Sequence, residues 1–117
     1  MGFFIVLKTV GLVDVLKAAI GSNSIQCAFV FGSVAQGTAK EESDIDLMVV
    51  GNIGLRKLTS LLSGMGNQLG REINPHVLTP EEYQDRVRRK EHFVMNVLAS
   101  PKLFVVGNDD DLTIMGK

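Results

Sequence analysis

The residues best suited to chemistry form two short groups, Gly32-Ser33 and Asp44-Ile45-Asp46, with ten residues between Ser33 and Asp44. Gly32-Ser33 directly follows an apolar run. A glycine lets the backbone approach an anion, and a serine hydroxyl with the amides of a helix start can hold a phosphate. Asp44 and Asp46 carry the hard oxygen ligands that magnesium prefers. The two groups together offer donors for phosphate oxygens and ligands for a metal ion, which phosphate chemistry on a nucleotide requires.

The spacing of Asp44 and Asp46 determines where their carboxylates point. Residues two apart on an extended strand share one face, so Ile45 and Leu47 point the opposite way, into a core. Two converging carboxylates repel each other, and one becomes protonated unless a cation neutralises them. The sequence therefore predicts that Asp44 and Asp46 bind Mg²⁺ or Mn²⁺, which links them to the phosphates of ATP or another nucleoside triphosphate.

The elements that would position these residues alternate between helices and strands. Apolar runs bounded by turn residues predict strands over 26–31, 45–50, 71–78 and 103–106. Helical spacing of apolar residues predicts helices over 7–20, over 55–69 and from 80 to about 100, with a short one between the first two strands.

Local signals refine three of these elements. Thr79-Pro80 is a strong helix start, and a break is expected near Glu91-His92. Pro75 lies inside the third strand, which indicates an edge position or a bulge. The run 108–111 is expected to be a polar turn into a short tail.

The length and element order predict one domain over residues 1–117. Neither internal repeats nor a linker is visible. The fold class is α/β, of the α+β type, with a mixed four-stranded sheet and helices packed mainly on one face.

Composition limits the classes of partner and compartment. The net charge of −1 gives no overall attraction for nucleic acid. The basic run 86–90 is either a solvated helix face or a receiver of triphosphate, an acidic partner or RNA. Cys27 is the single cysteine, which excludes an internal disulfide and a zinc finger. No apolar stretch reaches the length of a membrane span, so no membrane is expected and the cytoplasm is the expected location.

Competing motifs fail on specific residues. Gly32 to Gly37 has the glycine spacing of a P-loop, but Thr38-Ala39 stands where Lys-Ser/Thr is required. Asp44-Ile45-Asp46-Leu47-Met48 lacks the third ligand and the glycine of an EF-hand loop. His76 and His92 are too far apart in sequence to suggest a zinc-binding helix.

Gly32-Ser33, ten residues and Asp44-Ile45-Asp46 resemble the signature of the polymerase-beta-like nucleotidyltransferase superfamily. The longer strings at 31–37 and 43–47 resemble its minimal prokaryotic branch. The resemblance implies magnesium-dependent transfer of a nucleoside monophosphate from a triphosphate, usually ATP. It also implies that Asp44 and Asp46 are catalytic and that Gly32 and Ser33 bind the nucleotide. Some members of this branch are antitoxins that adenylylate a helical partner toxin.

The segment from Val6 onward also resembles the catalytic half of proteins with an N-terminal winged helix-turn-helix domain. The chain is then either a free-standing relative or that catalytic half alone.

The third strand departs from the superfamily pattern. Active members usually place a third carboxylate there, where it helps to activate the attacking hydroxyl. The best-aligned residue here is Asn74, whose carbonyl can ligate a metal but cannot take a proton. Glu72 and His76 share its face in a regular strand and are alternative third residues. Loss of a general base typically costs about 10²–10⁴-fold in rate.

The sequence thus leaves two functions open. The first is a magnesium-dependent nucleotidyltransferase that transfers AMP from ATP. The second is a nucleotide-binding regulatory or antitoxin-like domain with weak or no transfer. The acceptor is also open between RNA, a protein such as a toxin-like helical partner and a small molecule, and a homodimer sharing the site is a further alternative. Gln36 and Lys40 are weaker candidates for nucleotide contact.

Overall fold

The structure is a computed structural model that describes residues 2–21, 24–37, 44–65 and 69–117. A sheet of four strands lies at its centre, in the order β3-β2-β1-β4. The strands are β1 (Ile25–Phe31), β2 (Ile45–Gly51), β3 (Ile73–Leu78) and β4 (Leu103–Val106). β1 pairs antiparallel with β2 and with β4, whereas β2 and β3 run parallel. The predicted mixed four-stranded sheet is therefore confirmed.

The two central strands are apolar on both faces. Every residue of β1 from Cys27 to Phe31 is buried, and Asp46 is the one residue of β2 that is not. Strands that are covered on both faces need such continuous apolar runs, because each successive side chain enters a core. Asp46 is thus a polar exception in a strand that is otherwise core.

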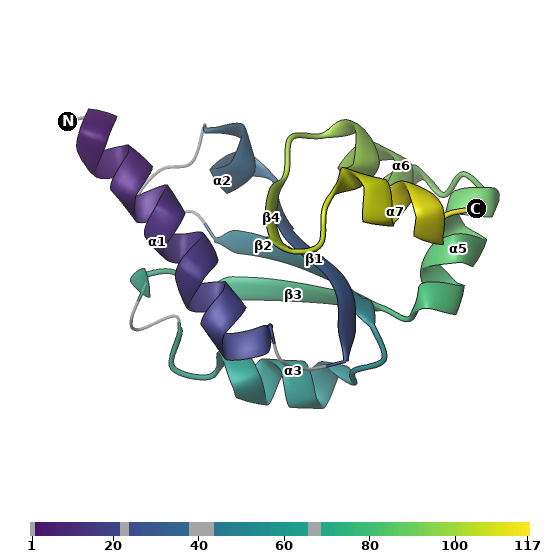
Figure 1. The fold of residues 1–117 in the computed structure, drawn as a ribbon, viewed down its shortest axis with the longest axis horizontal. Helices are drawn as coiled ribbons and strands as arrows, with labels where there is room; N and C mark the ends of the chain where they lie inside the picture. The colour runs from purple at the N-terminus through teal and green to yellow at the C-terminus, as the bar shows by residue number, and fades with distance from the viewer. Residues whose placement is uncertain (1, 22–23, 38–43, 66–68) are drawn as a thin grey trace.

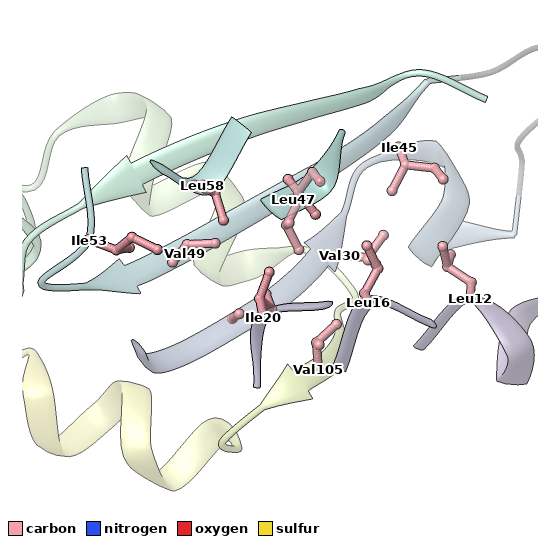
Figure 2. Packing of buried hydrophobic residues seen from close by; sticks show 12 residues of the cluster. Leu12, Leu16, Ile20, Val30, Ile45, Leu47, Val49, Ile53, Leu58 and Val105 are labelled. Carbon is pink, nitrogen blue, oxygen red and sulfur yellow. The ribbon is translucent and has the colours of Figure 1, made fainter. Parts of the chain in front are cut away.

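One face of the sheet is covered by α1 (Gly2–Ile20) and α3 (Leu55–Leu62). In Figure 2, Leu16 and Ile20 of α1 and Leu58 of α3 lie over the strand residues of this face. All three helix residues are fully buried. Figure 1 shows α1 and α3 to the left of and below the sheet.

The opposite face is covered by α5 (Pro80–Arg88), α6 (His92–Ala99) and α7 (Asp109–Met115). These three helices gather at the upper right of Figure 1. They bury Tyr83, Val94, Val97 and Leu112 against Phe29, Met48 and Val50. The structure thus differs from the expectation of helices mainly on one face. Because β1 and β2 are apolar on both sides, each side needs its own cover.

Helix α7 replaces the polar turn that was expected over 108–111. The Asn108 side chain accepts a hydrogen bond from the backbone N–H of Asp111, whose carboxylate accepts one from the Asn108 N–H. This reciprocal cap makes a polar run into a helix start. Thr79 and Glu82 form the same arrangement at α5, where the helix start was predicted.

The predicted break near Glu91-His92 is confirmed as the turn between α5 and α6. Lys90 has a φ of 54° there. The Lys90 N–H donates to Val87 O, and the Glu91 N–H donates to Arg86 O, each at 3.0 Å. This is the pattern that closes a helix through a left-handed residue, a position usually held by glycine.

α3 ends at Leu62, earlier than the predicted Leu69. Ser63 leaves the helical region with a ψ of 130°, and Gly64 follows with a φ of 86°. Apolar spacing alone did not reveal this end, because the apolar residues continue beyond it.

β3 is an edge strand, which is one of the two positions that Pro75 indicated. Its pairing with β2 runs without interruption from Ile73 to Leu78, so the proline introduces no bulge. No helix in the described part of the chain is long and apolar enough to cross a membrane.

Candidate active site

Gly32 brings the two halves of the motif together. It ends β1 and precedes the one-turn helix α2 (Ser33–Gln36), with a φ of 77° and a ψ of −153°. Only glycine adopts this conformation at low cost. A Cβ on Gly32 would lie 2.6 Å from Asp46 Oδ2, closer than nonbonded atoms approach. The glycine is therefore required both by its backbone angles and by the nearness of the carboxylate.

Asp46 is the second residue of β2, and Asp44 directly precedes the strand. Asp46 pairs with Phe31 of β1 and with Asn74 of β3, so it occupies the middle of three adjacent strands. Asp44 is exposed and Asp46 is partly exposed. Ile45 and Leu47 between and after them are 1% and 0% exposed, which confirms that the alternate residues enter the core.

Asn74 contacts the acidic pair directly. Its side-chain Nδ2 donates a hydrogen bond to Asp44 Oδ2 at 3.1 Å, and its backbone lies opposite Asp46. Of the three alternative third residues, Asn74 is thus the one with a hydrogen bond to an aspartate of the pair. An amide there orients Asp44 and offers a carbonyl oxygen, but it cannot accept a proton from an attacking hydroxyl.

Glu72 and His76 lie on either side of Asn74 and have other surroundings. The Glu72 backbone O accepts a hydrogen bond from the Ile45 N–H at 2.8 Å, and its side chain is exposed. His76 is partly buried and packs beside two phenylalanine rings. Within the ranges that the structure describes, no three acidic, histidine or cysteine side chains are grouped closely enough to hold a metal ion.

A group of three rings adjoins the carboxylates, and the sequence did not reveal it. We call it the ring cluster: Phe31 of β1, His76 of β3 and Phe93 of α6. The ring centroid of His76 lies 5.5 Å from the centroid of Phe31 and 5.5 Å from that of Phe93, and the centroids of the two phenylalanines are 6.1 Å apart. The three residues come from three separate elements, so no local spacing connects them.

The chemistry of the donors suits a hard divalent cation. Magnesium is typically bound through one or two carboxylates and the phosphates of its substrate, with waters completing the shell. Asp44 and Asp46 supply two carboxylates, and Asn74 adds a carbonyl oxygen next to Asp44. The tight approach of Gly32 to Asp46 leaves room there only for backbone. These residues therefore fit a metal–triphosphate complex.

The basic run 86–90 is largely occupied by ion pairs within its own helices. Arg88 and Arg89 each contact Asp85 at 2.8 Å, and Arg86 contacts Glu91 at 3.0 Å. The hydrogen bond from Arg88 is the main cause that lowers the pKa of Asp85. This arrangement favours the solvated helix face over a receiver of phosphate. Gln36 is exposed, and Lys40 lies outside the described residues.

Cys27 is a core residue, as its apolar surroundings in the sequence suggested. It is completely buried, and burial raises the pKa of its thiol to about 12, with smaller contributions from Asp111 and Asp109. A thiol in this state is a poor nucleophile at neutral pH.

Comparison with known proteins agrees with the geometry of the site. The profile of the family described as "Polymerase beta, Nucleotidyltransferase" matches residues 14–104, which contain both halves of the motif and all of β3. The chain belongs to this family. No curated protein matches the sequence.

Solved structures with the same fold include toxin–antitoxin proteins. One, described as the toxin-antitoxin with AMP-PNP, is 18% identical, with a TM-score of 0.58 over 92% of this chain and 80% of that one. A mutant of the toxin-antitoxin MntA-HpeT is 17% identical, with the same TM-score and the same coverage. At such identities the likeness concerns the fold, and it confirms the nucleotidyltransferase fold that the motif predicted.

Proposed function

We propose that this nucleotidyltransferase domain transfers AMP from ATP to a hydroxyl acceptor with the help of Mg²⁺, so that the acceptor oxygen bonds to the α-phosphorus and pyrophosphate leaves. One observation carries the proposal: Gly32 at the end of β1 lies against Asp46, while Asn74 of β3 holds Asp44. The turn that we propose for phosphate binding and the two proposed metal ligands therefore meet at one end of the central strands β1 and β2. The family match over residues 14–104 supports the same reaction class.

The residues divide the work by their chemistry. Backbone groups at Gly32-Ser33, where α2 starts, bind triphosphate oxygens, since the first amides of a helix attract anions. Asp44 and Asp46 hold the metal. When bound, the metal neutralises phosphate charge and favours in-line displacement at phosphorus. Asn74 fixes the orientation of Asp44 through its hydrogen bond.

Solved structures of the same fold suggest which class of acceptor should be tested first. Two solved structures of the same fold are described as toxin–antitoxin structures, one of them with AMP-PNP. We therefore propose a protein acceptor, a helical toxin-like partner, before RNA or a small molecule. The net charge of −1 and the paired arginines of α5 also give little support to RNA.

The test measures binding and transfer together. The protein is incubated with α-labelled ATP, MgCl₂ and a candidate partner, and labelled product is counted beside a calorimetric titration of ATP. We expect magnesium-dependent binding and label on the acceptor, both lost in Asp44→Asn and Asp46→Asn. Glu81→Gln, an exposed carboxylate in the first turn of α5, is the matched control and should behave as wild type. Equal binding and transfer in the Asp46→Asn and wild-type proteins would refute the proposal.

A second function is favoured by one specific contact. Asn74 stands beside both aspartates, at the position where an acidic residue would complete the site, and donates to Asp44 instead of accepting a proton. This favours a domain that binds nucleotide and transfers slowly or not at all. The variant Asn74→Asp distinguishes the two. A gain in transfer of about 10²-fold or more, with ATP affinity unchanged, identifies the wild type as a weak enzyme. Robust wild-type transfer that Asn74→Asp leaves unaltered would exclude this second function.

A further inference from the structure

The ring cluster is a feature that the motif does not explain. Phe31 immediately precedes Gly32 and pairs with Asp46, and His76 follows Asn74 by two residues on the same face of β3. The cluster therefore lies on the face of the sheet that carries the carboxylates.

The outer part of the cluster is accessible. Phe31 is 8% exposed and forms the buried base of the group, whereas His76 is partly exposed. Phe93 is 39% exposed, which is unusual for a phenylalanine ring. An exposed phenylalanine beside a buried one and a histidine offers an aromatic surface rather than an isolated apolar residue.

We propose that the ring cluster is the binding surface for the nucleobase of the triphosphate; this rests on the function proposed above. Stacking on aromatic side chains accepts any base, because each has a π-face. The exposed ring of Phe93 and the ring of His76 provide that contact, and the buried ring of Phe31 packs against both.

The placement fits the order of groups in a nucleotide. With triphosphate oxygens at Gly32-Ser33 and the metal at Asp44 and Asp46, the nucleoside lies beyond the carboxylates. His76 is two residues beyond Asn74 along β3, or roughly 6.6 Å at the usual rise of a strand. A ribose spans a gap of this order between its phosphate and its base. The cluster thus starts where the base would arrive.

The occupant is a nucleobase rather than a second protein surface because of this continuity with the site. Two other exposed apolar residues, Leu55 of α3 and Ile114 of α7, lie on other helices and are not members of the ring cluster. They serve as positions for controls. An acceptor that carries an aromatic ring is the alternative occupant, and the experiment separates it.

Calorimetry with three probes tests the proposal: Mg-ATP, Mg-CTP and Mg-tripolyphosphate, which has no base. Phe93→Ala should weaken ATP binding about five- to a hundredfold, the range that loss of one stacked base implies. It should leave tripolyphosphate binding unchanged, and Phe93→Trp should restore ATP binding. ATP should bind more tightly than CTP, because a purine covers more ring surface, and Phe93→Ala should reduce this difference. Ile114→Ala, with an exposed side chain on α7, should bind all three probes as wild type.

The outcomes separate this proposal from the function on which it rests. If Phe93→Ala binds ATP as wild type while Asp46→Asn loses both ATP and tripolyphosphate, the base subsite is refuted and the metal–phosphate site stands. Unchanged ATP binding with slower transfer to an acceptor would also refute it and assign the cluster to the acceptor. If the wild-type protein binds no triphosphate, both proposals fail. Circular dichroism of Phe93→Ala excludes unfolding as the cause of weaker binding.

Discussion

The two faces of the central sheet use the same strands for different purposes. The face below α1 and α3 is apolar along the length of β2, through Ile45, Leu47 and Val49. The opposite face is apolar only over Met48 and Val50, under α5, α6 and α7, and it carries Asp46 at its other end. Since successive strand residues point to opposite faces, β2 can hold a complete core on one side and a polar site on the other.

The difference between the two faces shows where a polar site can lie without destabilising the fold. A carboxylate in the middle of the second face would be buried by helices and would lose its water. At the start of β2 the strand emerges from the helix layer, so Asp46 stays partly exposed and Asp44 is exposed. The proposed site occupies the end of the sheet that the core does not need.

The largest effect is expected on the rate of transfer when Asp46, at the polar end of the second face, is replaced. Asp46→Asn should reduce transfer on the order of a hundredfold or more, since a metal supplies several kcal/mol of transition-state stabilisation. Its free energy of unfolding should change by no more than about 0.5 kcal/mol, as for most partly exposed sites. Initial rates with labelled ATP and urea unfolding check the two quantities. A large loss of stability would mean that Asp46 supports the fold instead.

The next effect is expected on the free energy of unfolding when Leu47, the neighbouring residue on the apolar face of β2, is truncated. Leu47 is 0% exposed, so Leu47→Ala should lower the free energy of unfolding by about 2–5 kcal/mol. Leu55→Ala removes the same atoms from a side chain that is 55% exposed and should change stability by about 0.5 kcal/mol or less. Urea unfolding of both variants measures the contrast. Similar losses of unfolding free energy in the two variants would show that β2 does not belong to the core on this face.

A third effect concerns the junction between the two halves of the motif. Gly32→Ala should destabilise the protein by about 1–3 kcal/mol, because the backbone conformation at Gly32 is one that alanine rarely adopts. It should also weaken metal–ATP binding, since the new Cβ would displace Asp46 Oδ2. Gly11→Ala, in the middle of α1 with open space around it, should instead stabilise by about 0.5–1 kcal/mol. Thermal unfolding and calorimetry follow both variants, and a neutral Gly32→Ala would contradict the close approach.

The smallest effect lies at the turn between α5 and α6, away from the site. Lys90→Gly should raise the free energy of unfolding by about 0.5–1 kcal/mol, because glycine accepts the φ of 54° without the cost that a side chain brings. Transfer activity should not change. Lys57→Gly, at the third residue of α3, should lower stability by up to about 1 kcal/mol. If both substitutions destabilise equally, Lys90 does not hold the left-handed conformation in solution.

Local sequence determined most of the fold and the identity of the acidic pair. Continuous apolar runs specified β1, β2 and β4, and Pro75 indicated an edge position for β3. The spacing of Asp44 and Asp46 gave them a common face, since the period of a strand is two residues. The helix α7 was missed, because its cap is a pair of reciprocal hydrogen bonds within a polar run that also resembles a turn.

Tertiary structure alone decided which residues from other elements lie beside the acidic pair. The bond from Asn74 to Asp44 joins residues 30 apart, and the ring cluster joins β1, β3 and α6. Only the parallel pairing of β2 with β3 sets Asn74 beside Asp46, and only the packing of α6 brings Phe93 to His76. Patterns along the chain report the direction of a side chain relative to its own element. They do not report which side chain of another element it will face, because that depends on strand order and on how helices pack.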